Sequence, residues 1–484
     1  MIKLFNNKYL FFFILVSLFL HTISVIFSIG FYSDDEHFQI LEITAFLLDI
    51  NKMALNDPTG HYWEWESGTR IRPWLQPYLF YLLLDKLIYS LSTDPFIWAF
   101  ILRSLCSTIG FISMIYLYFT FKDYFFTKNY KFNILLYFTF WFYPFLHSRT
   151  SSENLSISLF IISICLLFNV IIKGKNFNFI KFVLGSLLMG FSMVFKFTTV
   201  FNAFPFFLWF VIYRYNFNKI FIFSSLILIT LSFGLYVDYI NWGSFKNTYY
   251  QYYIHNLSSG ETGRMKYFGI DPWYFYFFEI IKQLAPLLSL FFLFGLIYFW
   301  LKKFNNILTW ITLFSFIIYS SIGHKEIRFM FSIYAFAPFF IAFLFEKISS
   351  QFILKFFKSL VIISNFIFLL ITLITPANNK VSVYKFIHEN IDDEQKIFYS
   401  DENPYLINNM EPFFYTHSLN KIMPINEKSL NEKNYWIVSN NYENISINLE
   451  NGCHLRYSTY PKRIIDMNNN WKRLNLNWYI IYCE

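Results

Sequence analysis

Long apolar runs separated by short polar segments dominate the chain. A helix needs about 20 mostly apolar residues to cross a bilayer, where its backbone groups must be satisfied internally. Runs close to that length occur at residues 9–31, 95–121, 132–148, 154–172, 178–195, 198–213, 219–237, 279–301, 307–322, 328–346 and 354–376. The pattern predicts an all-α polytopic membrane protein with about eleven transmembrane helices.

The distribution of basic residues predicts the orientation of these helices. Lys and Arg collect in alternate loops, at 122–131, 173–181, 214–219, 302–303 and 347–358. Cytoplasmic loops carry such an excess, so these loops are expected on the cytoplasmic side, with the first run kept as a span. The remaining loops, which hold every polar motif of interest, are then expected outside the cytoplasm.

Two segments interrupt this pattern. The stretch 74–91 contains Gln76, Pro77 and Asp85, so we expect a juxtamembrane or re-entrant helix that does not fully cross the membrane. The runs 178–195 and 198–213 are separated only by Lys196 and Phe197. Lys196 could neutralise a phosphate at this broken turn, or it could reach the lipid headgroups.

The composition changes after residue 376. Residues 1–376 form the predicted membrane domain, and residues 377–484 form a predicted small soluble α/β domain outside the cytoplasm. Its expected strands lie at 396–400, 435–439 and 478–482, with a helix at 381–391. If this tail lies outside the cytoplasm, Cys453 and Cys483 could form a disulfide.

Composition excludes several classes of function. The 484 residues are 56% hydrophobic and only 14% charged, which is not typical of a soluble domain. The net charge of +8 reflects loop residues that topology explains, so nucleic-acid binding has no support. The four cysteines lack metal-ligand spacing. We therefore expect no metal and no cofactor.

Four carboxylates directly follow the first apolar run, at Asp34, Asp35, Glu36 and Glu42. A helix beginning here would place Asp35, Gln39 and Glu42 on one face as an acidic ridge. Carboxylates beside a span usually serve a site. Our hypothesis is that Asp35 is the general base of a glycosyl transfer at the outer surface, with Glu36 as the substitute candidate.

Three more polar groups are candidates for substrate binding. The first outer loop, within 31–94, carries Trp63, Glu64 and Arg70, which could contact sugar faces, hydroxyls or phosphate. An interfacial aromatic belt is the alternative. The long outer loop 238–278 carries Asn256 and Trp273, as a sugar contact or a structural lid.

The segment 323–329 holds four ionisable residues, namely His324, Lys325, Glu326 and Arg328. Such a group at a membrane edge suits an anionic lipid headgroup. The alternative is an interfacial loop with a snorkelling Arg328.

These blocks, in this order, resemble the mannosyltransferases of glycosyltransferase family 22. The run 324–329 looks the same as the family's His-Lys-Glu-x-Arg-Phe element. The family's other elements are similar to residues 34–42, 62–72, 238–243 and 268–276, and more loosely to 149–153, which begins with Arg149. The similarity looks greatest to the members that add the third mannose of glycosylphosphatidylinositol anchors.

The resemblance implies a GT-C-type enzyme of the endoplasmic reticulum membrane, or of the inner membrane in a bacterium, with its site on the luminal or periplasmic side. It would transfer mannose, with inversion, from a polyprenyl (dolichyl) phosphate donor to a glycolipid acceptor. Arg328, Lys196 and His324 would stabilise the departing phosphate. The competing interpretations are a polyprenyl-phosphate-sugar transferase that acts on protein or lipid A-like acceptors, and a lipid or sugar transporter.

Overall fold

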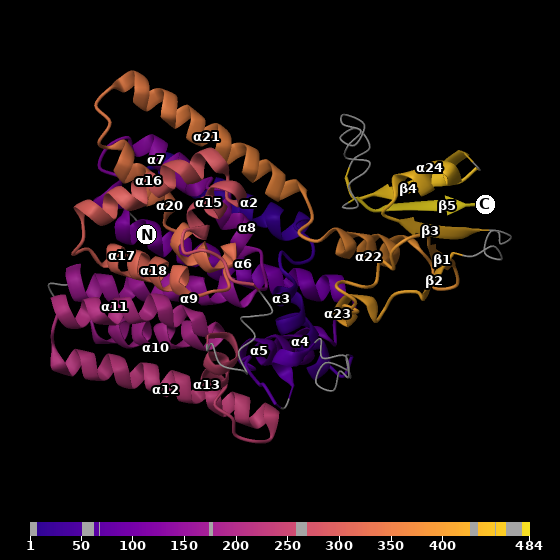
Figure 1. The fold of residues 1–484 in the computed structure, drawn as a ribbon, viewed down its shortest axis with the longest axis horizontal. Coiled ribbons are helices and arrows are strands. Elements are labelled where there is room, and N and C mark those ends of the chain that lie inside the picture. Colours follow the sequence, from indigo (N-terminus) through magenta and orange to yellow (C-terminus); the bar gives the residue numbers. More distant parts are fainter. Residues whose placement is uncertain are drawn as a thin grey trace. The chain divides into compact units, whose positions relative to one another are not determined.

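The computed structural model describes residues 7–50, 62–66, 68–173, 178–257, 269–425, 434–450, 452–460 and 477–484. The chain divides into two compact units that interleave along the sequence. The first, here the helical unit, comprises Met1–Val25, Trp63–Gln76 and Arg103–Leu373. The second, here the mixed unit, comprises Ile26–Tyr62, Pro77–Leu102 and Ile374–Glu484. Figure 1 shows that every strand of the described residues belongs to the mixed unit.

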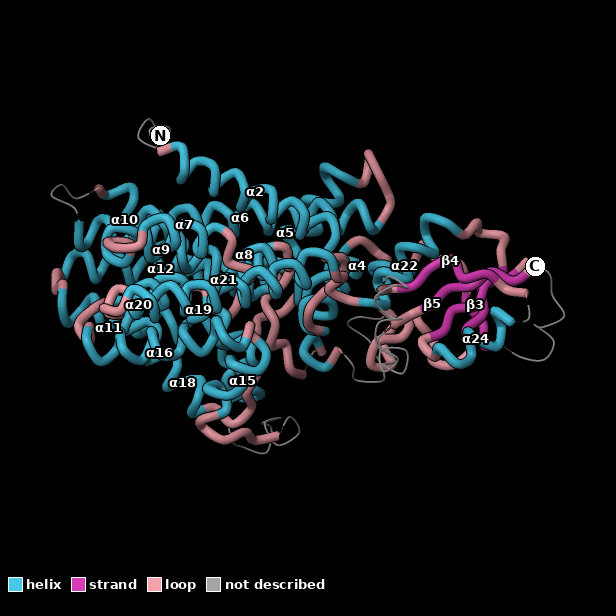
Figure 2. The backbone as a smooth tube through the Cα atoms, turned by 90° about the horizontal axis from the view of Figure 1, so that it is seen from above, coloured by secondary structure: helices cyan, strands magenta, loops and turns pink. Residues whose placement is uncertain are grey.

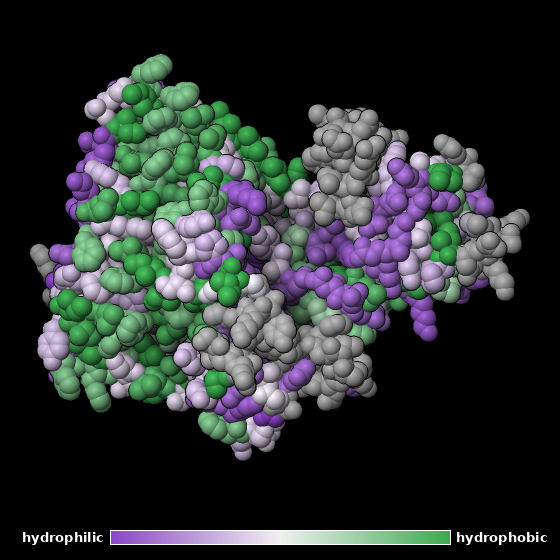
Figure 3. All heavy atoms as spheres, in the orientation of Figure 1, coloured by the Kyte–Doolittle hydropathy of each residue, from purple (hydrophilic) through white to green (hydrophobic). Residues whose placement is uncertain are grey.

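Five helices of the described residues are long and apolar enough to cross a membrane, or six with one bent pair. The five are α2 (Lys8–Phe27), α6 (Pro95–Phe125), α9 (Ser152–Phe168) with the π-turn η4 (Asn169–Lys173), α12 (Phe217–Trp242) and α21 (Gln351–Ile374). Large apolar side chains along α21 face outward, including Phe352 at 83% exposure. Figure 3 shows apolar side chains over much of the visible surface of the helical unit. The protein is therefore a multi-pass membrane protein.

The remaining predicted spans are shorter or broken. The other helices of the helical unit are α7 (Tyr130–Phe138), α8 (Phe142–His147), α10 (Phe179–Phe195), η5 (Phe197–Thr199), α11 (Val200–Tyr213), α13 (Thr248–Tyr252), η6 (Tyr253–Leu257), α15 (Phe275–Gln283), α16 (Pro286–Lys302), α17 (Ile307–Thr309), η7 (Trp310–Phe314), α18 (Ser315–Ser321), η8 (Ile327–Met330), α19 (Phe331–Tyr334) and α20 (Ala337–Phe345), with η2 (Trp63–Trp65) in the first outer loop. The bent pair joins η8 and α19 to α20 at 58°. Hydropathy predicts apolar runs but not these breaks, because a broken helix keeps its composition.

The core of the helical unit centres on α20. A Cβ added at Gly295 of α16 would lie 2.3 Å from the Phe340 carbonyl oxygen, so the glycine allows the two helices to approach closely. On another side of α20 the Phe339 ring lies 5.1 Å from Phe126 and 5.2 Å from Tyr137, measured between ring centroids. Aromatic packing of this kind contributes much of the contact at the centre of this unit.

A buried asparagine forms hydrogen bonds to the backbone at the break between α7 and α8. Asn365 of α21 accepts a hydrogen bond from the Trp141 N–H at 3.0 Å and donates to the Thr139 carbonyl at 2.8 Å. Its side chain is fully buried. Because a lipid environment offers no water to the freed backbone groups, the amide must satisfy them.

The stretch expected to lie beside the membrane forms α5 (Leu75–Leu83) and the π-turn η3 (Leu84–Ile88). It is not among the described helices long enough to cross. The mixed unit also contains α3 (Asp34–Glu36), η1 (His37–Leu41), α4 (Glu42–Leu47), α22 (Asn379–Asn390), α23 (Phe413–Thr416) and α24 (Tyr442–Glu450). Most of the chain is helical in Figure 2.

A five-stranded sheet in the described residues forms the rest of the mixed unit, in the order β2-β1-β3-β5-β4. Its strands are β1 (Lys396–Tyr399), β2 (Ile422–Pro424), β3 (Tyr435–Ser439), β4 (His454–Ser458) and β5 (Tyr479–Cys483). β1 pairs in parallel with β2 and β3, whereas β5 is antiparallel to β3 and β4. The strands expected from the apolar runs are β1, β3 and β5, and α22 is the expected helix. The tail is therefore an α/β structure.

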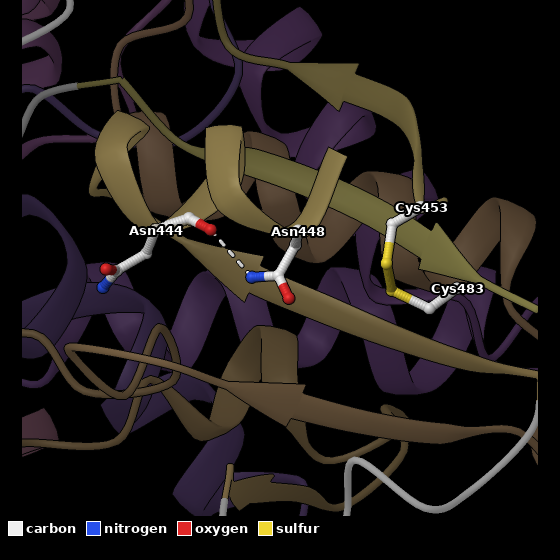
Figure 4. The surroundings of a disulfide bond; sticks show 4 residues. All are labelled: Asn444, Asn448, Cys453 and Cys483. Carbon is white, nitrogen blue, oxygen red and sulfur yellow. Dashed lines mark hydrogen bonds between the residues drawn. A yellow bond between two sulfur atoms is a disulfide. The ribbon is translucent and has the colours of Figure 1, made fainter. Parts of the chain in front are cut away.

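Cys453 and Cys483 are joined by a disulfide beside β5 (Figure 4). Figure 4 also shows the bond from the Asn448 amide to the Asn444 carbonyl in α24, which packs against this sheet. Disulfides persist in oxidising compartments, so the pairing agrees with a tail outside the cytoplasm.

We predict that Asn365→Leu destabilises the helical unit, because it leaves the Trp141 N–H and the Thr139 carbonyl without a partner in a buried site. The expected loss is about 1–3 kcal/mol of unfolding free energy. Thermal unfolding of the purified protein in detergent measures it. Ser359→Ala is the control, since Ser359 is exposed on the same helix and bonds only to its own turn. Equal midpoints for the two variants would contradict the role of Asn365.

Candidate functional site

A polar pocket lies inside the helical unit, at the breaks of its helices. Its empty volume is about 350 Å³, open solvent included. Residues from α9, η5, α11, α18, η8 and α19 line it together with Lys196. The lining residues are Glu153, Ser156, Ile157, Phe160, Lys196, Thr198, Thr199, Asn202, Tyr319, Arg328, Phe329 and Ser332. Three of them are charged, which is rare inside an apolar bundle and indicates a functional site.

Glu153 enters the pocket from the first turn of α9. The Ser151 side chain caps this helix by accepting a hydrogen bond from the Asn154 N–H at 3.2 Å. The Asn154 amide in turn donates to the carbonyls of His147, at 2.9 Å, and Arg149, at 2.7 Å. The start of α9 is thus fixed, and a carboxylate there is favoured by the partial positive charge of the helix terminus.

Lys196 enters the pocket from the break between α10 and η5. Its backbone is extended, with φ −142° and ψ 107°, so the chain turns out of the helix at this residue. Its ammonium lies 2.7 Å from Oε1 of Glu153, and only 7% of the side chain is exposed. Ser156 of α9 bonds to the Thr199 hydroxyl and to the Ser192 carbonyl, which holds the break against α9. The broken turn expected from the sequence is therefore present, with its lysine directed inward.

Arg328 enters the pocket from η8. Its Nε and Nη2 bond to the Glu326 carboxylate, the latter at 2.8 Å, while Nη1 lies 3.5 Å from Oε1 of Glu153. His324 Nε2 lies 3.1 Å from Glu326. The structure thus brings four predicted site residues, Lys196, His324, Glu326 and Arg328, into one chain of polar contacts through Glu153.

Lys325 points away from this chain of contacts. Its ammonium donates to the carbonyls of Asp271, at 2.8 Å, Ile322, at 2.5 Å, and Gly323, at 3.3 Å. Burial lowers the pKa of Lys325, and Asp271 opposes that shift. Lys325 therefore joins residues 322–323 to Asp271 of the long outer loop.

The first outer loop contacts α12 and the turn after it. Arg72 forms an ion pair with Glu64 at 2.6 Å. Arg70 donates to the Ser244 hydroxyl at 2.6 Å and lies 4.7 Å from the centre of the Trp242 ring. Arg70 thus joins residues 63–76, which belong to the helical unit, to the end of α12. For Trp63 the structure describes the backbone in η2 but not the side chain.

Asp238 of α12 has a role that the sequence analysis did not assign to it. It is buried and accepts hydrogen bonds from the Trp74 N–H at 2.8 Å and the Thr248 hydroxyl at 2.7 Å. Glu153 and Tyr319 were also missing from the predicted site residues. Asp238 and Glu153 each lie at the edge of an apolar run, and this position is the sequence signal that could have identified them.

Three predicted binding residues lie apart from the described pocket lining. Arg149 is buried and bonds to the Ser148 hydroxyl at 3.1 Å. Asn256 is half-buried in η6, and Trp273 is 67% exposed. Phe268, at the start of the same family-like element, lies outside the described residues. The substrate roles of these residues stay predictions.

In the mixed unit the expected acidic ridge does not form. The π-turn η1 widens the helix between α3 and α4, so Asp35, Gln39 and Glu42 do not follow one α-helical face. Gln39 is 5% exposed and Glu42 is fully buried, whereas Asp35 is half-buried. The carboxylate of Glu36, itself buried, accepts the Tyr32 N–H at 2.9 Å.

Glu42 holds two segments of the mixed unit together. Its Oε1 lies 2.6 Å from His37 Nε2 and accepts the Phe414 N–H of α23 at 2.9 Å. His37 is itself fully buried between the rings of Phe31 and Tyr415. Among the four carboxylates, this geometry leaves Asp34 and Asp35 as the ones partly open to solvent.

Two known proteins have a similar fold. ArnT from Cupriavidus metallidurans, solved in the apo state and bound to undecaprenyl phosphate, matches with a TM-score of 0.54 and 8% identity over 97% of both chains. The Archaeoglobus fulgidus oligosaccharyltransferase, solved with a tethered acceptor peptide, matches with a TM-score of 0.51 and 11% identity over 91% of this chain and 70% of its own. These likenesses show that the chain shares its fold with both proteins.

The sequence profile of the Alg9-like mannosyltransferase family matches residues 10–416. The chain belongs to this family and is a membrane glycosyltransferase. A transporter, the rival interpretation from the sequence, is thereby disfavoured. No curated protein sequence gives a significant match.

We predict that Glu42→Leu destabilises the mixed unit by about 2–4 kcal/mol, because it leaves the buried Phe414 N–H and His37 without their acceptor. Thermal unfolding and limited proteolysis of the tail measure the effect. The control is Glu389→Gln in α22, because the Glu389 side chain is 54% exposed. A Glu42→Leu protein of normal stability that had lost only substrate affinity would instead support a binding role.

Proposed function

We propose that the protein transfers mannose from a polyprenyl phosphate donor to a lipid-linked glycan, such as a glycosylphosphatidylinositol precursor. The observation that carries this proposal is the pocket in which Lys196 and Arg328 converge on one carboxylate oxygen. Two cations that meet at an oxyanion suit a phosphate group. The ligand of the similar structure of ArnT, undecaprenyl phosphate, supports the same class of donor.

Arg328 is held ready for a phosphate. Glu326 pairs with the guanidinium and accepts a hydrogen bond from Nη2, which restrains Arg328 where it lines the pocket. Lys196 supplies further N–H donors beyond its bond to Glu153. Charges that are already oriented stabilise the negative charge that develops on a leaving phosphate without reorganising during the reaction.

Asp35 is the proposed general base. It would take the proton of the acceptor hydroxyl, whose oxygen attacks the anomeric carbon of mannose while the bond from that carbon to the phosphate oxygen breaks. The polyprenyl phosphate leaves with the bonding electrons, and the anomeric carbon is inverted to an α-mannoside, with α-1,2 as the expected linkage. Glu36 and Glu42 are buried whereas Asp35 is half-buried, which supports Asp35 over them.

The reaction is proposed for the non-cytoplasmic face of the membrane. The distribution of basic residues between loops and the Cys453–Cys483 disulfide support this side. The membrane would be that of the endoplasmic reticulum in a eukaryote and the inner membrane in a bacterium. Neither the proposed base nor the proposed phosphate contacts require a metal ion.

A second candidate function is transfer of another polyprenyl-phosphate-linked sugar to a protein or to a lipid A-like acceptor. The likeness in fold to ArnT and to an oligosaccharyltransferase favours it over unrelated reactions. Family membership favours mannose as the sugar. Both functions place a lipid phosphate in the same pocket, so the acceptor distinguishes them.

We predict that Asp35→Asn lowers turnover at least about a hundredfold, because the amide cannot accept the proton. The measurement is transfer of labelled mannose from polyprenyl-phosphate mannose to extracted glycolipid. Asp34→Asn is the matched control, since Asp34 is the adjacent, partly exposed carboxylate and accepts a bond from Asn408. Full activity of Asp35→Asn would exclude Asp35 as the base.

We also predict that Arg328→Met weakens donor use about a hundredfold or more in kcat/KM, because the pocket loses a fixed charge that contacts the phosphate. Arg328→Lys should recover only part of this loss, since an ammonium lacks the fork that binds Glu326. Steady-state kinetics at varied donor concentration measures both. Unchanged donor kinetics in Arg328→Met would contradict the assignment of the pocket to the phosphate.

A further inference from the structure

The proposed phosphate pocket contains a carboxylate of the protein, that of Glu153. Glu153 lies 2.7 Å from the Lys196 ammonium and 3.5 Å from Nη1 of Arg328, and its side chain is 9% exposed. Glu326 binds the other side of the same guanidinium. The two cations and two carboxylates of this group therefore cancel in charge. A pocket that only had to attract phosphate would gain nothing from the carboxylate of Glu153.

The contacts of Glu153 show which of them a ligand can replace. The distance to Nη1 of Arg328 is longer than a hydrogen bond, while Nε and Nη2 of the same residue bond to Glu326. Nη1 therefore lies near the Glu153 carboxylate but beyond the usual hydrogen-bond distance from it. A phosphate oxygen can bind Nη1 and Lys196 while the Glu153 carboxylate stays close to both.

Donor and product of the proposed reaction differ in charge at this point. The donor is a phosphodiester with one negative charge. The product is a phosphomonoester, which carries about 1.5 to 2 negative charges at pH 7. Without the Glu153 carboxylate the pocket would favour the more highly charged product over the donor, so the enzyme would be inhibited by the lipid phosphate that it releases.

We infer that Glu153 is a specificity-determining residue that sets the pocket to favour the phosphodiester donor over the phosphomonoester product. This inference rests on the proposed function and adds a role for a residue that the proposal does not use. The Glu153 carboxylate repels the doubly charged monoester more strongly than the singly charged diester. After transfer, the same repulsion promotes release of the polyprenyl phosphate.

The test compares two soluble probes of equal chain length, farnesyl phosphate and its methyl diester. Their dissociation constants are measured by calorimetry on the full-length protein in nanodiscs at pH 8, where the monoester is a dianion. In the wild type the diester should bind at least as tightly as the monoester. In Glu153→Gln the monoester should gain at least about tenfold relative to the diester, the effect of one unit charge at contact range in a partly buried site.

Two further variants serve as controls. Glu153→Asp keeps the charge and should keep the wild-type ratio of the two dissociation constants. Glu279→Gln removes a carboxylate of α15 that pairs with Lys282 outside the described pocket lining, and should also leave the ratio unchanged. A change in ratio for Glu279→Gln equal to that for Glu153→Gln would overturn the inference.

The remaining outcomes separate this inference from the proposed function. If both probes bind, and Arg328→Met weakens both, but the ratio is equal in the wild type and Glu153→Gln, the inference fails and the phosphate pocket stands. If Arg328→Met changes the affinity of neither probe, both the inference and the proposed function fail. If Glu153→Gln does not fold, the ratio of the two dissociation constants in the wild type provides the test. A monoester bound more than tenfold tighter than the diester would then overturn the inference.

Discussion

The structure depends on one physical constraint, which is that buried charges and freed backbone groups need partners within the protein. In the helical unit Glu153 lies between Lys196 and Arg328, so three charges are buried together and none is left alone. Asn365 likewise provides partners for the backbone groups at the break between α7 and α8. Polar side chains thus satisfy the groups that two interruptions of the helices leave inside an apolar bundle.

The breaks themselves create the candidate site. Lys196 occupies an extended residue between two helices, and Arg328 lies on the short η8 turn before the bend at α20. Unbroken helices would direct these side chains along the membrane-spanning surface, whereas a break lets a long side chain turn into the interior. The candidate site in this protein therefore depends on the interruption of its helices.

In the mixed unit the carboxylates that follow the first span have different roles, although the sequence presents them as one acidic group. Glu36 and Glu42 bond to backbone N–H groups and are buried, and Asp34 contacts Asn408. Asp35 is half-buried. The packing of α23 against α4 makes Glu42 an internal group, and Glu36 is internal through its bond to Tyr32. Spacing along the chain does not show this difference between neighbouring acids.

The sequence by itself determined that the chain is a multi-pass membrane protein, where its main apolar runs lie and that its tail has α/β character. These follow from hydropathy, alternation and charge, which are local properties of the chain. Only the tertiary structure decided that Glu153 joins Lys196 to Arg328, that Lys325 binds carbonyls, and that Glu42 is internal. Each depends on which distant segment supplies a partner, and contacts between distant segments leave no local pattern in the sequence.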